Sequence, residues 1–281
     1  MVSVGRRFHE TQSVRTRGNR DFCSILISLF LLGYPQSVQA QEKAGTNKTG
    51  TVMIGDTGFD ASAAFVTADD GSWTWSAGPG YDMSKELGDQ NNCGTLELKD
   101  LTLSFAGTRA PTAGESHGAI QSAIFVPAGT IIKVSGKNTI ENLARGDFTA
   151  GMAINGDVLF IGDGTLDVMD RQTALDTQSS TTIGILVFGA MVADGPDITA
   201  AGGVATEGKT TSAAQRSEGL YVGKDLVCGK GSVKASSGAA VLSGDSSSNG
   251  MSVFGSIHIS GTGAVTGRGN KATGMTYGIY R

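Results

Sequence analysis

Aspartates in equivalent positions of a repeating sequence are the first candidates for chemistry. Asp157 and Asp225 occupy the same position of two near-repeats, whereas Ala190 and Ser256 occupy it in the repeats between and after them. Calcium sites and acid–base pairs need two or more carboxylates close together. Two strand spacings separate the two aspartates, roughly 10 Å, which is too far for them to share an ion. The sequence therefore predicts no carboxylate ladder.

A second acidic group surrounds a single predicted turn and strand and consists of Asp163, Asp167 and Asp170. Acidic side chains of this kind keep a surface soluble, and we expect that role for them. Calcium, which prefers oxygen ligands, is the alternative ligand of this group and the single candidate cofactor of the chain.

The histidines and cysteines form no catalytic or metal-binding pattern in the sequence. His9, His117 and His258 lie far from one another and have no cysteine at metal-ligand spacing. Cys93 and Cys228 are also far apart, and Cys228 falls on a position expected to face inward. We therefore expect a buried thiol rather than a disulfide.

Aromatic side chains are the candidates for carbohydrate binding, because a ring face packs against the C–H groups of a sugar. Trp73 and Trp75 are two residues apart, so they share one face of a strand, and Tyr81 follows. This group predicts either an exposed sugar platform or the core of a terminal cap. Tyr221 is the fourth candidate, at an outward position of its strand.

The composition indicates an architecture with many tight turns to carry these residues. Glycine accounts for 42 of 281 residues and proline for 5, and hydrophobic residues make up 39%. Average chains contain about half this share of glycine. Short β-branched runs separated by glycines favour strands joined by tight turns.

Near-repeats that begin at glycines decide the fold class. Successive starts are separated by 33, 33, 35, 31 and 28 residues, at Gly118, Gly151, Gly184, Gly219, Gly250 and Gly278. Within a unit, apolar residues alternate, which is the period of a strand. Each unit thus predicts three short strands joined by corners, followed by a longer polar segment of variable sequence.

Such units are too small to fold alone, so they must stack as a parallel β-solenoid. The same alternation extends upstream, and we expect the solenoid over residues 94–281. Residues 41–93 break the register and predict an N-terminal β cap over the open sheet edge. The final unit stops in mid-strand, which predicts an array truncated at its C-terminal end.

The first forty residues predict a cleaved secretory signal peptide. Five arginines precede an apolar run at 22–34, and small residues end at Ala40. The remaining chain has 17 basic and 24 acidic residues, a net charge of −7. This balance argues against nucleic-acid partners, and no later apolar stretch predicts an integral membrane segment. We expect an extracellular or cell-surface location.

Several stretches resemble secreted bacterial repeat proteins that carry carbohydrate-binding β-helix domains, a pectin-binding-like family. The residues that carry this resemblance read GSWTWSAG, TLELKDLTL, GAI, VPAGTIIKVSGKNTIEN, INGDVLFIGDGTLDV and TYGIY. The resemblance implies a single-stranded, right-handed parallel β-helix. It also implies non-catalytic binding of acidic plant polysaccharide, with calcium in some members.

The expected function is therefore a non-catalytic β-solenoid that binds an extracellular polysaccharide or a host or cell-surface glycan, or that acts as an adhesin. The variable segments, which emerge along one edge, are a further candidate surface. One alternative is a pectate-lyase-like or glycosidase enzyme, which would need clustered carboxylates. Another is a purely structural repeat region of a larger surface protein.

Overall fold

The computed structural model describes twelve segments of the chain: residues 42–46, 52–53, 66–67, 72–77, 94–105, 120–126, 128–144, 146, 148–171, 180–205, 215–240 and 246–281. They form strands and connections only. The predicted signal peptide, over residues 1–40, lies outside this part of the chain. None of the described segments is a helix long and apolar enough to span a membrane.

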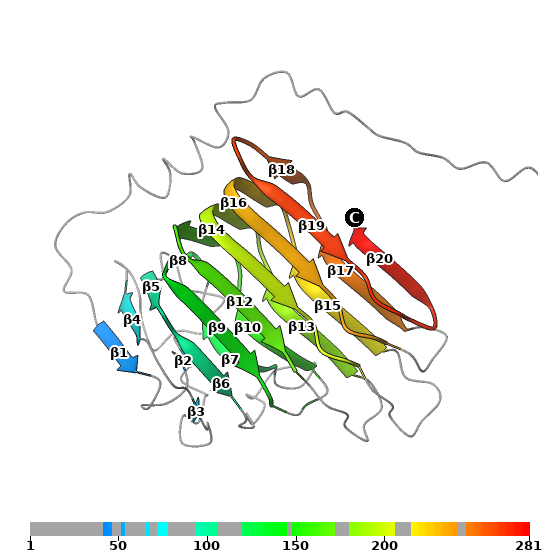
Figure 1. The fold of residues 1–281 in the computed structure, drawn as a ribbon, viewed down its shortest axis with the longest axis horizontal. Coiled ribbons are helices and arrows are strands. Elements are labelled where there is room, and N and C mark those ends of the chain that lie inside the picture. The colour runs from blue at the N-terminus through cyan, green and yellow to red at the C-terminus, as the bar shows by residue number, and fades with distance from the viewer. Residues whose placement is uncertain are drawn as a thin grey trace, which may run out of the picture. The chain divides into compact units, whose positions relative to one another are not determined.

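Parallel strands stack into a β-solenoid of about five turns, which confirms the predicted fold class. The first strands of successive coils form a seven-stranded sheet (Figure 1). Its members are β2 (Val52–Met53), β7 (Gln121–Val126), β10 (Phe148–Ile154), β13 (Ser180–Val187), β15 (Gln215–Val222), β17 (Ser247–Val253) and β20 (Met275–Tyr280).

The second and third strands of the coils belong to one thirteen-stranded sheet that supplies the other two faces. The second-strand face contains β5 (Gly94–Lys99), β8 (Thr130–Ser135), β11 (Val158–Gly162) and β18 (Ile257–Ile259). The third-strand face contains β6 (Thr102–Phe105), β9 (Lys137–Asn142), β12 (Thr165–Asp170) and β19 (Ala264–Arg268). In two coils a single long strand runs through both faces, β14 (Met191–Ala201) and β16 (Leu226–Ser236).

Antiparallel strands lie at the N-terminal edge of the stack. β4 (Ser72–Ala77) pairs with β5, and β1 (Glu42–Thr46) pairs with β4, both antiparallel. β3 (Val66–Thr67) pairs antiparallel with β6. These strands occupy the position for which the sequence predicts a cap, and their reversed direction ends the parallel stacking of the thirteen-stranded sheet, whereas β2 pairs parallel with β7 in the other sheet.

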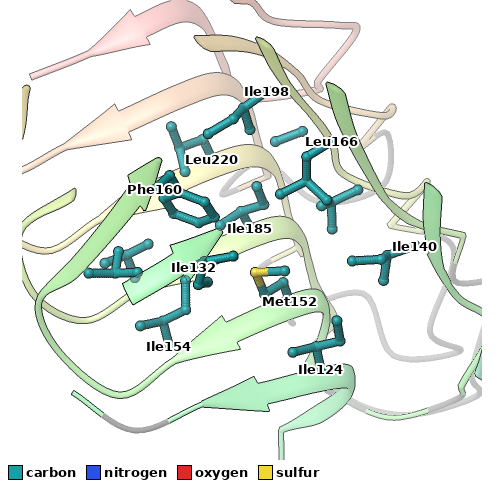
Figure 2. Packing of buried hydrophobic residues seen from close by; sticks show 14 of the residues in the cluster. Ile124, Ile132, Ile140, Met152, Ile154, Phe160, Leu166, Ile185, Ile198 and Leu220 are labelled. Carbon is teal, nitrogen blue, oxygen red and sulfur yellow. The ribbon is translucent and has the colours of Figure 1, made fainter. Parts of the chain in front are cut away.

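The interior consists of the apolar columns that the alternation predicts. Met152, Ile185, Leu220 and Met251 are register partners in successive first strands, and all four are buried. Phe160 stacks on Ala193, and Ala193 on Cys228, in the second-strand face. Figure 2 shows side chains from all three faces meeting inside the coils.

The last coil departs from this pattern. Val265 and Ile257 are only partly buried, and Ile259 is 54% exposed, although each continues a column that is buried elsewhere. The difference has a simple cause, since no further coil of the described chain stacks on β18 and β19.

The glycines that start each repeat are required by a close approach at the third corner. A Cβ atom on Gly219 would lie 2.4 Å from the backbone nitrogen of Ser236 and 2.6 Å from the carbonyl oxygen of Gly250. The first and third strands of one coil therefore approach backbone to backbone there, and the first strand of the next coil lies equally close. Any side chain at this position would separate them.

A ladder of hydroxyl groups inside the same corner fixes the backbone that follows the third strand. Thr182 and Ser217 are register partners and are buried, and both donate to the carbonyl oxygen of Gly203, at 2.9 and 2.7 Å. Ser248 donates to the carbonyl oxygen of Gly238 at 2.9 Å. The beginning of each variable segment is thus fixed by hydrogen bonds, while residues 172–179, 206–214 and 241–245 lie outside the described residues.

Candidate functional site

The two aspartates of the repeat hold the backbone of the next coil. Asp157 Oδ1 accepts hydrogen bonds from the Ala190 backbone nitrogen at 2.8 Å and from Lys224 Nζ at 3.3 Å. Asp225 Oδ1 accepts from the Ser256 backbone nitrogen at 2.6 Å. Each carboxylate thus closes the corner between first and second strands, which gives these aspartates a structural role.

The second acidic group does not stay together at the surface. Asp163 is exposed, but Asp170 is buried, so the expectation of a solubilising role is wrong for this residue. Asp170 accepts hydrogen bonds from Thr149 Oγ1 and, at 3.4 Å, from Asn142 Nδ2. Asp170 points inward because its alternation places it on the interior side of β12. No three His, Cys, Asp or Glu side chains come together as a metal site within the described segments.

Cys228 is a buried free thiol, as its inward position predicts. Burial is the main cause that raises the pKa of this thiol above its usual value, and Asp194 and Asp197 add to the effect. His258 is exposed on β18, whereas Cys93, His9 and His117 lie outside the described residues. The thiol therefore belongs to the core and not to a reactive site.

The tryptophan pair does not provide an exposed platform at Trp73. The Trp73 side chain is 8% exposed and belongs to the main core cluster, opposite Leu98 of β5. Trp75 lies opposite Leu96, but its side chain is outside the described residues, as is the whole of Tyr81. At Trp73 the structure therefore matches the cap-core interpretation.

Tyr221 lies on the outer side of the seven-stranded sheet, at the outward position that the sequence predicts. Its column runs through Leu186 of β13, Ser252 of β17 and Tyr280 of β20. Leu186 is buried, in a small outer cluster against which the partly buried Tyr221 packs. The column thus changes along the solenoid from the buried Phe125, Ala153 and Leu186 to the partly buried Tyr221, then to the buried Ser252 and the exposed Tyr280.

A second outward column, two residues further along each strand, supplies two more rings. Phe188 follows β13 and Phe254 follows β17, and Gly223 lies between them in β15's coil. The backbone ladder continues through all three residues, since each nitrogen donates to the preceding coil at 2.9 to 3.0 Å. Phe188 and Phe254 are 43% and 56% exposed, and Tyr280 is 40% exposed.

Together these residues form an aromatic row with one ring in each of four successive coils: Phe188, Tyr221, Phe254 and Tyr280. The rings alternate between the two columns. The Tyr221 and Phe254 ring centroids are 5.2 Å apart, and those of Phe254 and Tyr280 are 6.4 Å apart. Tyr277 extends the group sideways, with its ring 5.3 Å from that of Tyr280.

The alternation has a steric cause at Gly223. A Cβ atom on this residue would lie 2.4 Å from the carbonyl oxygen of Phe188 in the coil below. The corner therefore excludes a ring at this position of the second column, and the ring of that coil stands at Tyr221 instead. A search of the sequence for one recurring column misses the row, because its members shift by two residues between coils.

A buried polar network supports the middle of the aromatic row. Glu218 is fully buried, and its Oε1 accepts from Arg216 Nε at 2.6 Å, Ser252 Oγ at 2.8 Å and Asn249 Nδ2 at 3.2 Å. The Arg216 guanidinium carbon lies 5.5 Å from the centroid of the Tyr221 ring. The network thus fixes the arginine on which the Tyr221 ring rests, a cation–π contact.

The comparisons with known proteins identify no relative. No family model matches the chain, no curated protein matches it, and no solved structure matches it. The functional argument therefore rests on the geometry of the aromatic row. That geometry offers exposed ring faces for apolar contact, held in place by a rigid sheet and a charged network.

Proposed function

We propose that this chain is an exported, non-catalytic module that binds carbohydrate through the aromatic row of Phe188, Tyr221, Phe254 and Tyr280. The observation that carries the proposal is the row itself, with ring contacts of 5.2 and 6.4 Å on the outside of the sheet. Sugars combine apolar C–H faces with hydroxyl groups, so they pack against exposed rings while remaining hydrated at their edges.

The exposure of these rings supports a binding role over a packing role. Soluble proteins bury most of their large apolar side chains, and contiguous exposed apolar patches mark interaction sites. The same strands place apolar side chains inside the coils, where Ile185, Leu220 and Met251 are fully buried. The exposed rings of Phe188, Phe254 and Tyr280 are therefore not needed to complete the core of the coils.

Rigidity is the second support for the proposal. The row stands on strands that are hydrogen-bonded to both neighbours from β13 to β17, so its rings lose little conformational freedom on binding. Tyrosine and phenylalanine have only two side-chain torsions to immobilise. A preformed platform of this kind favours binding without rearrangement.

The export part of the proposal rests on the sequence. A secretory signal typically has basic residues, then an apolar run, then small residues before the cleavage site. This chain has five arginines, the apolar run at 22–34 and small residues ending at Ala40. The resemblance to secreted carbohydrate-binding β-helix proteins supports the same assignment. An exported chain would meet polysaccharides of a cell wall or extracellular matrix.

Retention of the full chain on immobilised insoluble and gelled polysaccharides tests this function. A Phe254→Ala/Tyr280→Ala double variant should lose retention, whereas Leu143→Ala, which removes an exposed aliphatic side chain outside the row, should keep it. Soluble product should also be measured, because cleavage would indicate an enzyme. The proposal is wrong if no polysaccharide retains the wild-type chain, or if the double variant is retained equally well.

A further inference from the structure

The direction of the aromatic row carries information about the shape of its ligand. Its four rings come from four successive coils, joined in register through β13, β15, β17 and β20. Successive parallel strands are about 4.8 Å apart, so the row extends over roughly 14 Å along the solenoid axis. Across the strands, its two columns are only two residues apart, roughly 7 Å.

From this geometry we infer that the row binds a linear polysaccharide in an extended form, lying along the solenoid axis and contacting one ring per coil. The inference rests on the proposed carbohydrate-binding function and adds the class of ligand and its orientation. Along the solenoid axis the rings recur with the strand spacing of about 4.8 Å, a step on the order of the length of one six-membered sugar ring. Successive sugars can therefore meet successive rings without a change of register.

A single terminal sugar fits the row less well. Phe188 and Tyr280 stand at opposite ends, three coils apart, so a ligand the size of one pyranose contacts only one or two rings. The contact area then grows with each sugar added until the chain covers the row. Affinity that increases with ligand length is the expected consequence of several weak contacts on one rigid template.

The charges beside the row indicate that ring contacts dominate over ion pairs. Arg216 is paired with the buried Glu218 at 2.6 Å, and Lys224, next to Gly223, is paired with Asp157 at 3.3 Å. These two cations are already neutralised by carboxylates of the chain. Binding should therefore change little between low and high salt, in contrast to binding that depends on exposed charges.

Oligosaccharides of increasing length, prepared from whichever of cellulose, xylan and polygalacturonate the full chain retains, provide the test by isothermal titration calorimetry. Affinity should rise with each sugar up to about four units, one per ring, and then change little. Phe188→Ala and Tyr280→Ala, at the two ends of the row, should each lower the affinity for the polymer about three- to tenfold. The conservative variants Phe188→Tyr and Phe254→Tyr should bind as the wild type does, and so should Leu143→Ala.

The results separate failure of the inference from failure of the proposed function. The inferred orientation along the solenoid axis is wrong if a monosaccharide binds as tightly as the polymer. It is also wrong if Phe188→Ala leaves the affinity for the polymer unchanged while Tyr280→Ala lowers it. In both cases the chain still binds carbohydrate. If no polysaccharide binds at all, the proposed function itself fails. Circular dichroism and thermal unfolding of every variant establish that a loss of binding is not a loss of fold.

Discussion

The two sides of the seven-stranded sheet differ in how their side chains change from coil to coil. On the inner side, the apolar columns hold an aliphatic side chain in coil after coil, as with Met152, Ile185 and Leu220. On the outer side, the column of Tyr221 changes from buried Leu186 to Ser252 and exposed Tyr280. The inner side is uniform because every coil must fill the same cross-section, whereas the outer side is free to vary and to carry recognition.

A large inner side chain gives the largest test of this difference. Phe160 is fully buried between coils, so Phe160→Ala should leave a cavity and lower the free energy of unfolding by about 3–5 kcal/mol. Urea denaturation followed by circular dichroism measures the change. Phe254→Ala is the matched control on the outside and should cost less than about 0.5 kcal/mol. Equal losses would contradict the division between inside and outside.

The corner where strands pass each other should be nearly as sensitive as the core. Gly219→Ala places a methyl group against backbone atoms of Ser236 and Gly250, so we expect a loss of about 1–3 kcal/mol in unfolding free energy. Thr266→Ala, at an exposed outward position of β19, is the control and should be close to neutral. A neutral Gly219→Ala would show that the repeated glycine is not a packing requirement.

The polar network under the row is a part of the outer side that should behave like a core. Glu218→Ala removes the acceptor of Arg216, Asn249 and Ser252, and should cost about 1–3 kcal/mol in unfolding free energy. In a double-mutant cycle with Arg216→Ala, the two losses should be less than additive, since both variants break the same 2.6 Å pair. Strict additivity would mean that the pair contributes nothing beyond its separate side chains.

Cys228 provides a smaller, pH-dependent test of the inner side. Burial raises the pKa of its thiol above its usual value, so the folded state holds the proton more tightly than the unfolded state. The resulting stabilisation is fully present below about pH 9 and is lost as pH rises through the raised pKa. Alkylation at pH 8, read by mass spectrometry of the Cys228 peptide, should be on the order of tenfold slower than in denaturant. Equally fast alkylation would place the thiol outside the core.

The fold could be predicted from the sequence because its main signals are local and repeated. Alternation in each strand identifies the inward residues, and recurring glycines identify the coils, so columns such as Met152 to Met251 were predictable without coordinates. The hydroxyl ladder of Thr182, Ser217 and Ser248 was not, because a polar residue in a polar segment carries no sign of burial. The inward position of Asp170 does follow the alternation of Leu166 and Val168, but an acidic side chain is ordinarily expected at the surface.

The candidate site was predictable only in part. Tyr221 could be placed on the outside from its neighbours Leu220 and Val222, which are both buried. Its partners could not, since Phe188 and Phe254 belong to another column and only the stacked coils bring their rings into one row. The close contact between Gly223 and Phe188 that produces this offset can be found only in the folded structure.

Two variants measured in two assays test the central claim most directly, that side chains inside the coils provide stability whereas those on the outside of the seven-stranded sheet provide recognition. Phe160→Ala and Phe254→Ala should each be measured for unfolding free energy and for polysaccharide affinity. We expect Phe160→Ala to lose stability while its folded fraction keeps wild-type affinity, and Phe254→Ala to lose affinity at nearly unchanged stability. A Phe254→Ala variant that binds as the wild type does, or that unfolds as readily as Phe160→Ala, would contradict the account.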